Sequence, residues 1–221
     1  MRYLAKITTT FALALVFSAG MAFGQNNDAS IDQTGDDAKA TITQTGNLNE
    51  ASIDQLDAND SYEASVLQQG EENVANVLQD GGNQKRSTIE QVGDRNEATV
   101  TVKGGGAIDL PDASAIYQTG NDNKAEINAG LISNGDSEIR QTGNENEAFV
   151  RGLDAGVADI TQNGDENFAE IDSGFFSAGS TASVTQNGDF NSGTIFQGST
   201  GNDATITQTG NNLDASITQD L

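Results

Sequence analysis

Hydrophobic and polar residues alternate along most of this chain, and short turn sequences interrupt the alternation at regular intervals. Between Ile89 and Val102, a row of aliphatic and carboxamide side chains alternates with a row of mostly acidic and hydroxyl side chains. A period of two residues predicts β-strands. The segment Gly93 to Asn96 is typical of a tight turn, because glycine adopts positive φ freely and asparagine tolerates it. The pattern therefore predicts a unit of strand, tight turn and strand.

This unit occurs eight times, and a glutamine in its first strand recurs every 21 to 27 residues. The residues two positions before and nine positions after this anchor are always β-branched, and alanine or serine stands four positions before it. The anchors are Gln44, Gln68, Gln91, Gln118, Gln141, Gln162, Gln186 and Gln208. Glycine stands two positions after each anchor, at Gly46, Gly70, Gly93, Gly120, Gly143, Gly164, Gly188 and Gly210. Length varies only between units, most of all between Lys103 and Asp112, where the only proline stands.

Two further carboxamide positions recur. Asparagine follows the anchor by five residues at Asn49, Asn73, Asn96, Asn123, Asn146, Asn167 and Asn191, and Leu213 takes this place in the last unit. A second glutamine stands at Gln55, Gln79, Gln197 and Gln219. In the middle four units Val102, Ala129, Gly152 and Ser173 replace it. The units nearest the two ends of the array therefore keep both glutamines.

A single hairpin of this size cannot bury its own apolar face, whereas stacked copies can. A repeat of 20 to 50 residues is typical of solenoids, propellers and arrays. We therefore predict an all-β solenoid of about eight strand-turn-strand rungs of about 23 residues, with two parallel sheets face to face in an amyloid-like cross-β stack. Buried carboxamides would be costly alone, but in register each can donate to one neighbour and accept from the other.

The first 24 residues are predicted to be a signal peptide. Arg2 and Lys6 precede an apolar run from Phe11 to Phe17, and a small-residue cleavage site ends at Gly24. The run is shorter than the roughly 20 residues of a membrane-spanning helix. Residues 25–41 form a short segment with half a repeat, and residues 42–221 form the solenoid. We expect export through the oxidising periplasm without membrane insertion.

Composition excludes several functions. With 33 acidic and 10 basic residues the formal charge is -23, so nucleic acid is not an expected partner. Without cysteine or histidine the chain has no disulfide, no thiolate zinc site and no histidine-based triad. No acidic cluster stands apart from the repeat, so we expect no enzyme activity, cofactor or metal site. The acidic turns are expected to restrain aggregation before export or simply to solvate the surface.

The segment Ile42 to Gln55 shows the whole motif, Ile-x-Gln-x-Gly-x-x-Asn-x-Ala-x-Ile-x-Gln. This motif closely resembles the curlin repeat, the repeat of curli subunits, and the resemblance extends over about residues 29–219. It implies an extracellular functional amyloid fibre on a Gram-negative bacterium, exported unfolded through an outer-membrane secretion pore and supporting adhesion and biofilm. The resemblance also implies a curli nucleator as a partner. The last repeat is not basic, which favours the major subunit over the nucleator.

The end rungs carry a separate hypothesis. Repeat sequence begins close to the predicted cleavage site and ends close to Leu221, so we expect uncapped rungs that join copies of the chain end to end. The main alternative is a capped, monomeric adhesin or surface-binding solenoid with the same fold. A β-helix enzyme, a calcium-binding β-roll and an ice-binding solenoid fit less well, because the sequence lacks a separate carboxylate cluster, the Gly-Gly-x-Gly-x-Asp repeat and a continuous threonine array.

Overall fold

The computed structural model describes residues 26–35, 37–58, 61–82, 84–104, 112–129, 135–153, 156–174 and 179–220. The predicted signal peptide, Pro111 and Leu221 lie outside the described residues. Within them the regular structure is entirely β-strand. The strands are β1 (Asp28–Gly35), β2 (Lys39–Thr45), β3 (Glu50–Ala58), β4 (Glu63–Gln69), β5 (Val74–Asp80), β6 (Lys85–Val92), β7 (Glu97–Lys103), β8 (Asp112–Thr119), β9 (Lys124–Ala129), β10 (Asp136–Thr142), β11 (Glu147–Leu153), β12 (Val157–Asn163), β13 (Phe168–Ser173), β14 (Thr181–Asn187), β15 (Ser192–Gln197), β16 (Asp203–Thr209) and β17 (Asp214–Gln219).

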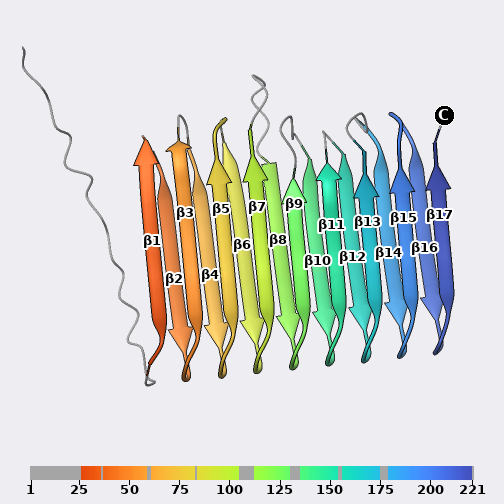
Figure 1. Ribbon diagram of the computed structural model, residues 1–221, viewed down its shortest axis with the longest axis horizontal. Helices are drawn as coiled ribbons and strands as arrows, with labels where there is room; N and C mark the ends of the chain where they lie inside the picture. The colour runs from red at the N-terminus through yellow and green to blue at the C-terminus, as the bar shows by residue number, and fades with distance from the viewer. Residues whose placement is uncertain are drawn as a thin grey trace, which may run out of the picture.

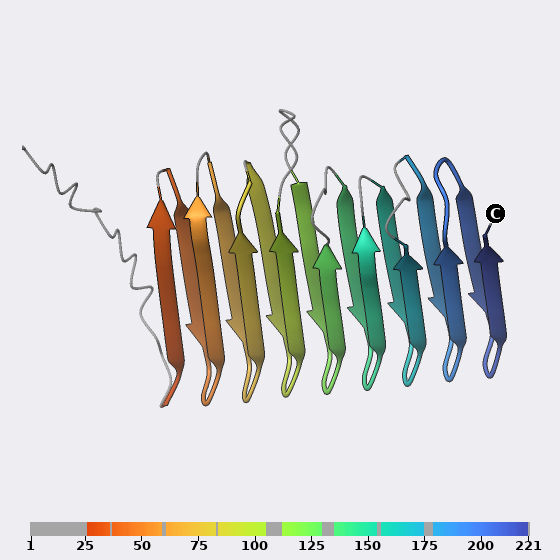
Figure 2. The same cartoon turned by 45° about the horizontal axis from the view of Figure 1, so that its top comes forward.

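The chain winds into two parallel sheets that lie face to face (Figures 1 and 2). One sheet holds the nine odd-numbered strands from β1 to β17, and the other holds the eight even-numbered strands from β2 to β16. Each even strand passes through a short turn into the next odd strand, which runs in the opposite direction in the facing sheet (Figure 1). The predicted all-β solenoid with two parallel sheets and a spacing of about 23 residues is confirmed.

Equivalent residues of successive rungs lie beside one another in register. In the even sheet Ile139 pairs with Ile160 and Gln141 with Gln162, and in the odd sheet Ala51 pairs with Ala75. The core between the sheets consists of isoleucine, valine and alanine rows, with Ile127 and Ile139 fully buried. Small alanines let the two sheets approach closely, so a narrow apolar layer is enough to hold the stack. No described helix is long and apolar enough to cross a membrane.

Two constraints require glycine in the fixed turn: its own positive φ and the close approach of the turn in the next rung. Gly143 has a φ of +119°, and a Cβ added to it would lie 2.1 Å from the carbonyl oxygen of Gly164 in the next turn. Successive turns touch through this glycine column and bond to each other, as in Gly143 N to Thr119 O at 2.9 Å. A side chain at this position would therefore push neighbouring rungs apart.

One expectation about the turn is wrong. The asparagine that closes it does not adopt positive φ in the described turns; the residue before it does, as at Arg95 with φ +54° and Glu145 with φ +55°. The asparagine instead turns its side chain inward, where Asn96 and Asn146 are fully buried. Its repetition reflects hydrogen bonding in the core rather than backbone tolerance.

The two ends of the described stack are more exposed than its middle. In β17 the inward-facing Ala215, Ile217 and Gln219 are only half-buried, whereas Ile195 of the adjoining β15 is fully buried. At the other end β1 pairs with β3 from Asp28 to Gln33 and then shifts register before Gly35. Both outer strands thus present inward-facing side chains and one free backbone edge.

Candidate functional site: the stacked amide ladders

The anchor glutamines form a continuous column inside the even sheet. Gln44 Nε2 donates to Gln68 Oε1 at 2.9 Å, and the same bond repeats at 2.8 to 3.0 Å through every rung to Gln208. The second hydrogen of each Nε2 goes to a backbone carbonyl across the core, as from Gln68 to Glu50 O at 3.0 Å. A buried carboxamide left unpaired would cost about 1–3 kcal/mol. Register supplies the partners that make this polar column compatible with a core.

The turn asparagines form a second column with the opposite polarity. Asn96 Nδ2 donates back to Asn73 Oδ1 at 3.0 Å and forward to Gly120 O at 2.8 Å. Its Oδ1 accepts from Asn123 N at 3.1 Å and Nδ2 at 3.0 Å. All four hydrogen-bonding positions of the amide are therefore filled. Because the glutamines donate towards the C-terminal end and these asparagines donate side chain to side chain towards the N-terminal end, the stack has a direction.

The second glutamine forms two separate short columns. Gln33 donates to Gln55 at 2.6 Å and Gln55 donates to Gln79 at 2.8 Å, and at the other end Gln197 donates to Gln219 at 3.1 Å. Gln79 bonds instead to Ser87 Oγ at 2.8 Å, because Val102 stands in the next rung. Through the middle, Val102, Ala129 and Ser173 are buried and Gly152 is half-buried. Apolar or small residues thus replace the amide without leaving a carboxamide unpaired.

Sequence reasoning missed the first member of the asparagine column. Asn27 lies one rung before Asn49 and accepts from its backbone N at 3.0 Å and its Nδ2 at 3.2 Å. The signal was the spacing of 22 residues between the two asparagines, but the partial unit around Asn27 lacks an anchor glutamine. At the other end Leu213 stops the column: its backbone N bonds to Asn191 Oδ1 at 3.1 Å and its side chain offers no amide.

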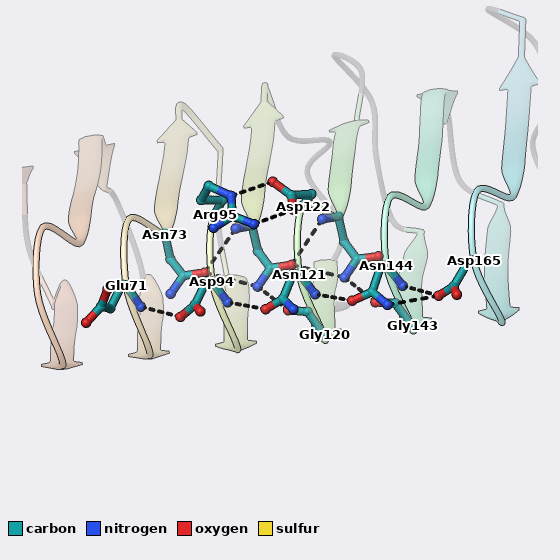
Figure 3. A network of polar contacts seen from close by, with 12 residues as sticks. Glu71, Asn73, Asp94, Arg95, Gly120, Asn121, Asp122, Gly143, Asn144 and Asp165 are labelled. Atoms are coloured by element: carbon teal, nitrogen blue, oxygen red, sulfur yellow. Dashed lines mark hydrogen bonds and ion pairs between the residues drawn. The ribbon is translucent and has the colours of Figure 1, made fainter.

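A third column runs along the outside of the turns, and it was also missed. Each member lends a side-chain oxygen to the backbone N of the preceding rung (Figure 3). Glu71 N bonds to Asp94 Oδ1 at 2.8 Å, Asp94 N to Asn121 Oδ1 at 2.9 Å, and Asn144 N to Asp165 Oδ1 at 2.7 Å. Aspartate and asparagine serve equally because only an acceptor is needed. Part of the acidic turn charge therefore has a structural function.

Exposed charge pairs occur beside these columns. The guanidinium of Arg95 forms two bonds of 2.7 Å to Asp122 in the next turn, and this hydrogen bonding lowers the pKa of Asp122 below its ordinary value (Figure 3). On the outer face of the even sheet, Asp159 lies beside Glu138 of the adjoining strand. Desolvation in a shallow hollow, followed by the charges of Glu138 and Asp136, raises the pKa of Asp159.

The described residues contain no group of three or more acidic side chains arranged to hold a metal ion. The columns provide hydrogen-bond donors and acceptors that all point along the stack and repeat at every rung. Their chemistry is repeated, reversible hydrogen bonding between identical rungs.

Comparison with known families identifies the repeat. The family described as "Curlin associated repeat" matches residues 24–56, 35–62, 178–210 and 191–220. These matches fall on the rungs that keep both glutamine columns, at the two ends of the array. A search of curated proteins finds no match. The matches identify curlin-associated repeats at both ends of the array, and the chain is a curlin-repeat protein.

Proposed function

We propose that this chain polymerises end to end into an extracellular curli-type fibre that supports surface adhesion and a biofilm matrix. The observation that carries the proposal is the open state of the columns at the ends of the described stack. Gln208 Nε2 donates to Ser192 O at 2.9 Å and has no second acceptor among the described residues, although every other anchor has one. Another rung with a glutamine at this place would complete it.

The outer strands supply the rest of the interface. An open strand edge presents unpaired backbone donors and acceptors, which pair readily with another chain. The half-buried Ile217 and Gln219 of β17 lack the cover that Ile195 and Gln197 of β15 receive. Addition of a rung would bury them and extend the same parallel pairing. Growth would therefore use the interactions that hold each subunit together.

Export is part of the same proposal. The segment up to Gly24 is proposed to direct the chain to the periplasm of a Gram-negative bacterium and to be removed there. An outer-membrane secretion pore would then pass the unfolded chain to the cell surface, where a curli nucleator would start the fibre. The chain itself would be the major subunit and would have no enzymatic activity.

The test is the fate of the purified chain 25–221 at micromolar concentration after removal from denaturant. We expect the soluble monomer to disappear after a lag and to be recovered as dye-positive, SDS-resistant fibres. Sedimentation and thioflavin fluorescence measure both changes. A folded chain that stays monomeric for days at this concentration would reject the fibre and favour the capped adhesin.

A further inference from the structure

We propose that β1 is an exchangeable edge strand that is displaced when two copies join, so that β16 and β17 of one copy pair with β2 and β3 of the next. This inference rests on the proposed fibre function and specifies its junction. In the free subunit β1 covers the edge of β3. In the fibre the same edge would be covered by β17 of the preceding copy.

The described sheets hold unequal numbers of strands, nine against eight. If β1 stayed in place, β17 would stack on β1 of the next copy and the odd sheet would be continuous. The even sheet would then lack one strand at every junction, with β16 and β2 about 9.6 Å apart instead of one spacing of about 4.8 Å. Displacement of β1 gives both sheets the same number of strands per copy.

The open amides at the two ends of the anchor column are complementary. Gln208 Nε2 lacks a second acceptor, and Gln44 Oε1 receives no donor among the described residues. Pairing of β16 with β2 in the prevailing register would place Gln208 beside Gln44, as each anchor lies beside the next within the subunit. With β1 retained, these two buried amides would face each other across the missing strand. Only the displaced arrangement continues the anchor column.

Charge supports the same register. Asp203 begins β16 beside Thr181, and Lys39 begins β2 beside Glu63, so the two would become neighbours at the junction. Opposite charges directly beside each other in a sheet attract, so this pair favours the junction. In the odd sheet, Asp214 would face Glu50 if β1 left and Asp28 if it stayed. That column is acidic in either case and does not distinguish the two arrangements.

The exchange replaces the strand pairing of β1 by its equivalent in β17, but the bonds from Asn49 to Asn27 are lost because Leu213 offers no amide at this place. The bonds that β1 makes to β3, including Gln33 to Gln55, have direct counterparts in β17, where Gln219 occupies the position of Gln33. The apolar burial that β1 gives up is small, because Ala29 and Ser30 are exposed and Ile31 is half-buried. The junction adds the pairing of β16 with β2 and the continued anchor column, which offset the lost bonds of Asn27. The edge strand would thus slow early contacts between copies.

Disulfide trapping distinguishes the two arrangements, and the chain has no native cysteine to interfere. Neighbouring parallel strands lie about 4.8 Å apart, within the Cα separation that a disulfide allows. Fibres are grown from equal mixtures of S216C with S52C, or of S216C with S30C, oxidised and dissociated without reductant. We expect several-fold more covalent dimer from S216C with S52C. A T205C and T41C mixture should also crosslink, because it reports the even sheet.

The rate of fibre elongation provides a second test, because the two arrangements predict opposite changes in it. Ile31→Asp loosens β1 and should accelerate elongation several-fold if β1 must leave, whereas it should slow elongation if β1 forms the junction. Ile217→Asp in β17 is the matched control and should slow growth in both arrangements. More dimer from S216C with S30C, no dimer from any pair, or slower growth of Ile31→Asp would overturn the inference while leaving the fibre intact. Absence of fibres from the parent chain would reject the proposed function and, with it, this junction.

Discussion

A buried carboxamide in this fold finds most of its partners in copies of itself. Asn146 donates to Asn123 Oδ1 at 3.0 Å and to Gly164 O at 2.7 Å, and it accepts from the backbone and side chain of Asn167. Removing one such residue therefore leaves donors and acceptors unpaired in the rungs above and below. The same residue type on the outer face has water as an alternative partner.

This contrast gives a prediction for a matched pair of asparagines. Asn146→Ala should lower the free energy of unfolding by about 2–4 kcal/mol, because more than one buried polar group loses its partner. Asn163→Ala removes an exposed bond of 3.0 Å to Asn187 and should change stability by less than about 0.5 kcal/mol. Urea unfolding of freshly refolded monomer measures both. Equal losses of unfolding free energy would show that the buried asparagine column contributes no more to stability than an exposed hydrogen bond.

The turn glycine gives a second prediction about a single residue. Gly143→Ala should cost about 2–6 kcal/mol, since both a strained φ and a clash with Gly164 O must be accommodated. Gly201→Ala is the control: its φ is +70°, but nothing lies within 4 Å of an added Cβ, so only about 1–2 kcal/mol is expected. Thermal unfolding of the two variants provides the comparison. Similar midpoints would contradict the close contact between turns.

Strands and register could be predicted from the sequence because the period of two and the eight aligned units leave one consistent stack. The burial of Gln141 and the glycine at Gly143 follow from the same alignment. Finer features could not be predicted. The outer turn column is built from both aspartate and asparagine, so the residue type at this position varies and resembles solvated charge. The backbone choice between Glu145 and Asn146 depends on contacts with neighbouring turns, which local propensity does not contain.

At the scale of a strand, the outer face of β12 gives a pH-dependent prediction. Desolvation and the adjoining Glu138 raise the pKa of Asp159 in the folded state. A raised folded pKa means that stability is gained as pH falls through this value and is lost as pH rises through it. Asp159→Asn should therefore be more stable than the parent at pH 7, by a few tenths of a kcal/mol to about 1 kcal/mol, the size of a like-charge cross-strand term.

The pH profile distinguishes this cause from a general effect of removing charge. Below the ordinary range of aspartate titration, the parent carboxyl is protonated in both states and the advantage of Asp159→Asn should disappear. Asp214→Asn, which removes one charge from the exposed β17, is the control for the change in net charge. Urea midpoints at several pH values measure the difference. A constant advantage for Asp159→Asn at every pH would refute the role of its titration.

The whole molecule combines a formal charge of -23 with a surface that is proposed to bind its own copy. Approach of two ends is opposed by this charge, whereas the hydrogen-bonded columns act only at contact. Salt shortens the range of the repulsion, from about 30 Å at 0.01 M to about 8 Å at 0.15 M ionic strength. We expect the lag before fibre growth to shorten markedly across this range. A lag that is independent of salt would show that charge does not limit assembly.

The central claim is that rungs of successive copies continue one stack along the fibre. X-ray diffraction from aligned fibres of the chain 25–221 tests it most directly, because strand spacing and strand orientation are read together. We expect a strong reflection at about 4.8 Å on the meridian, parallel to the fibre axis. The same reflection on the equator would mean that the solenoids lie across the fibre and join through their sides, which would contradict end-to-end stacking.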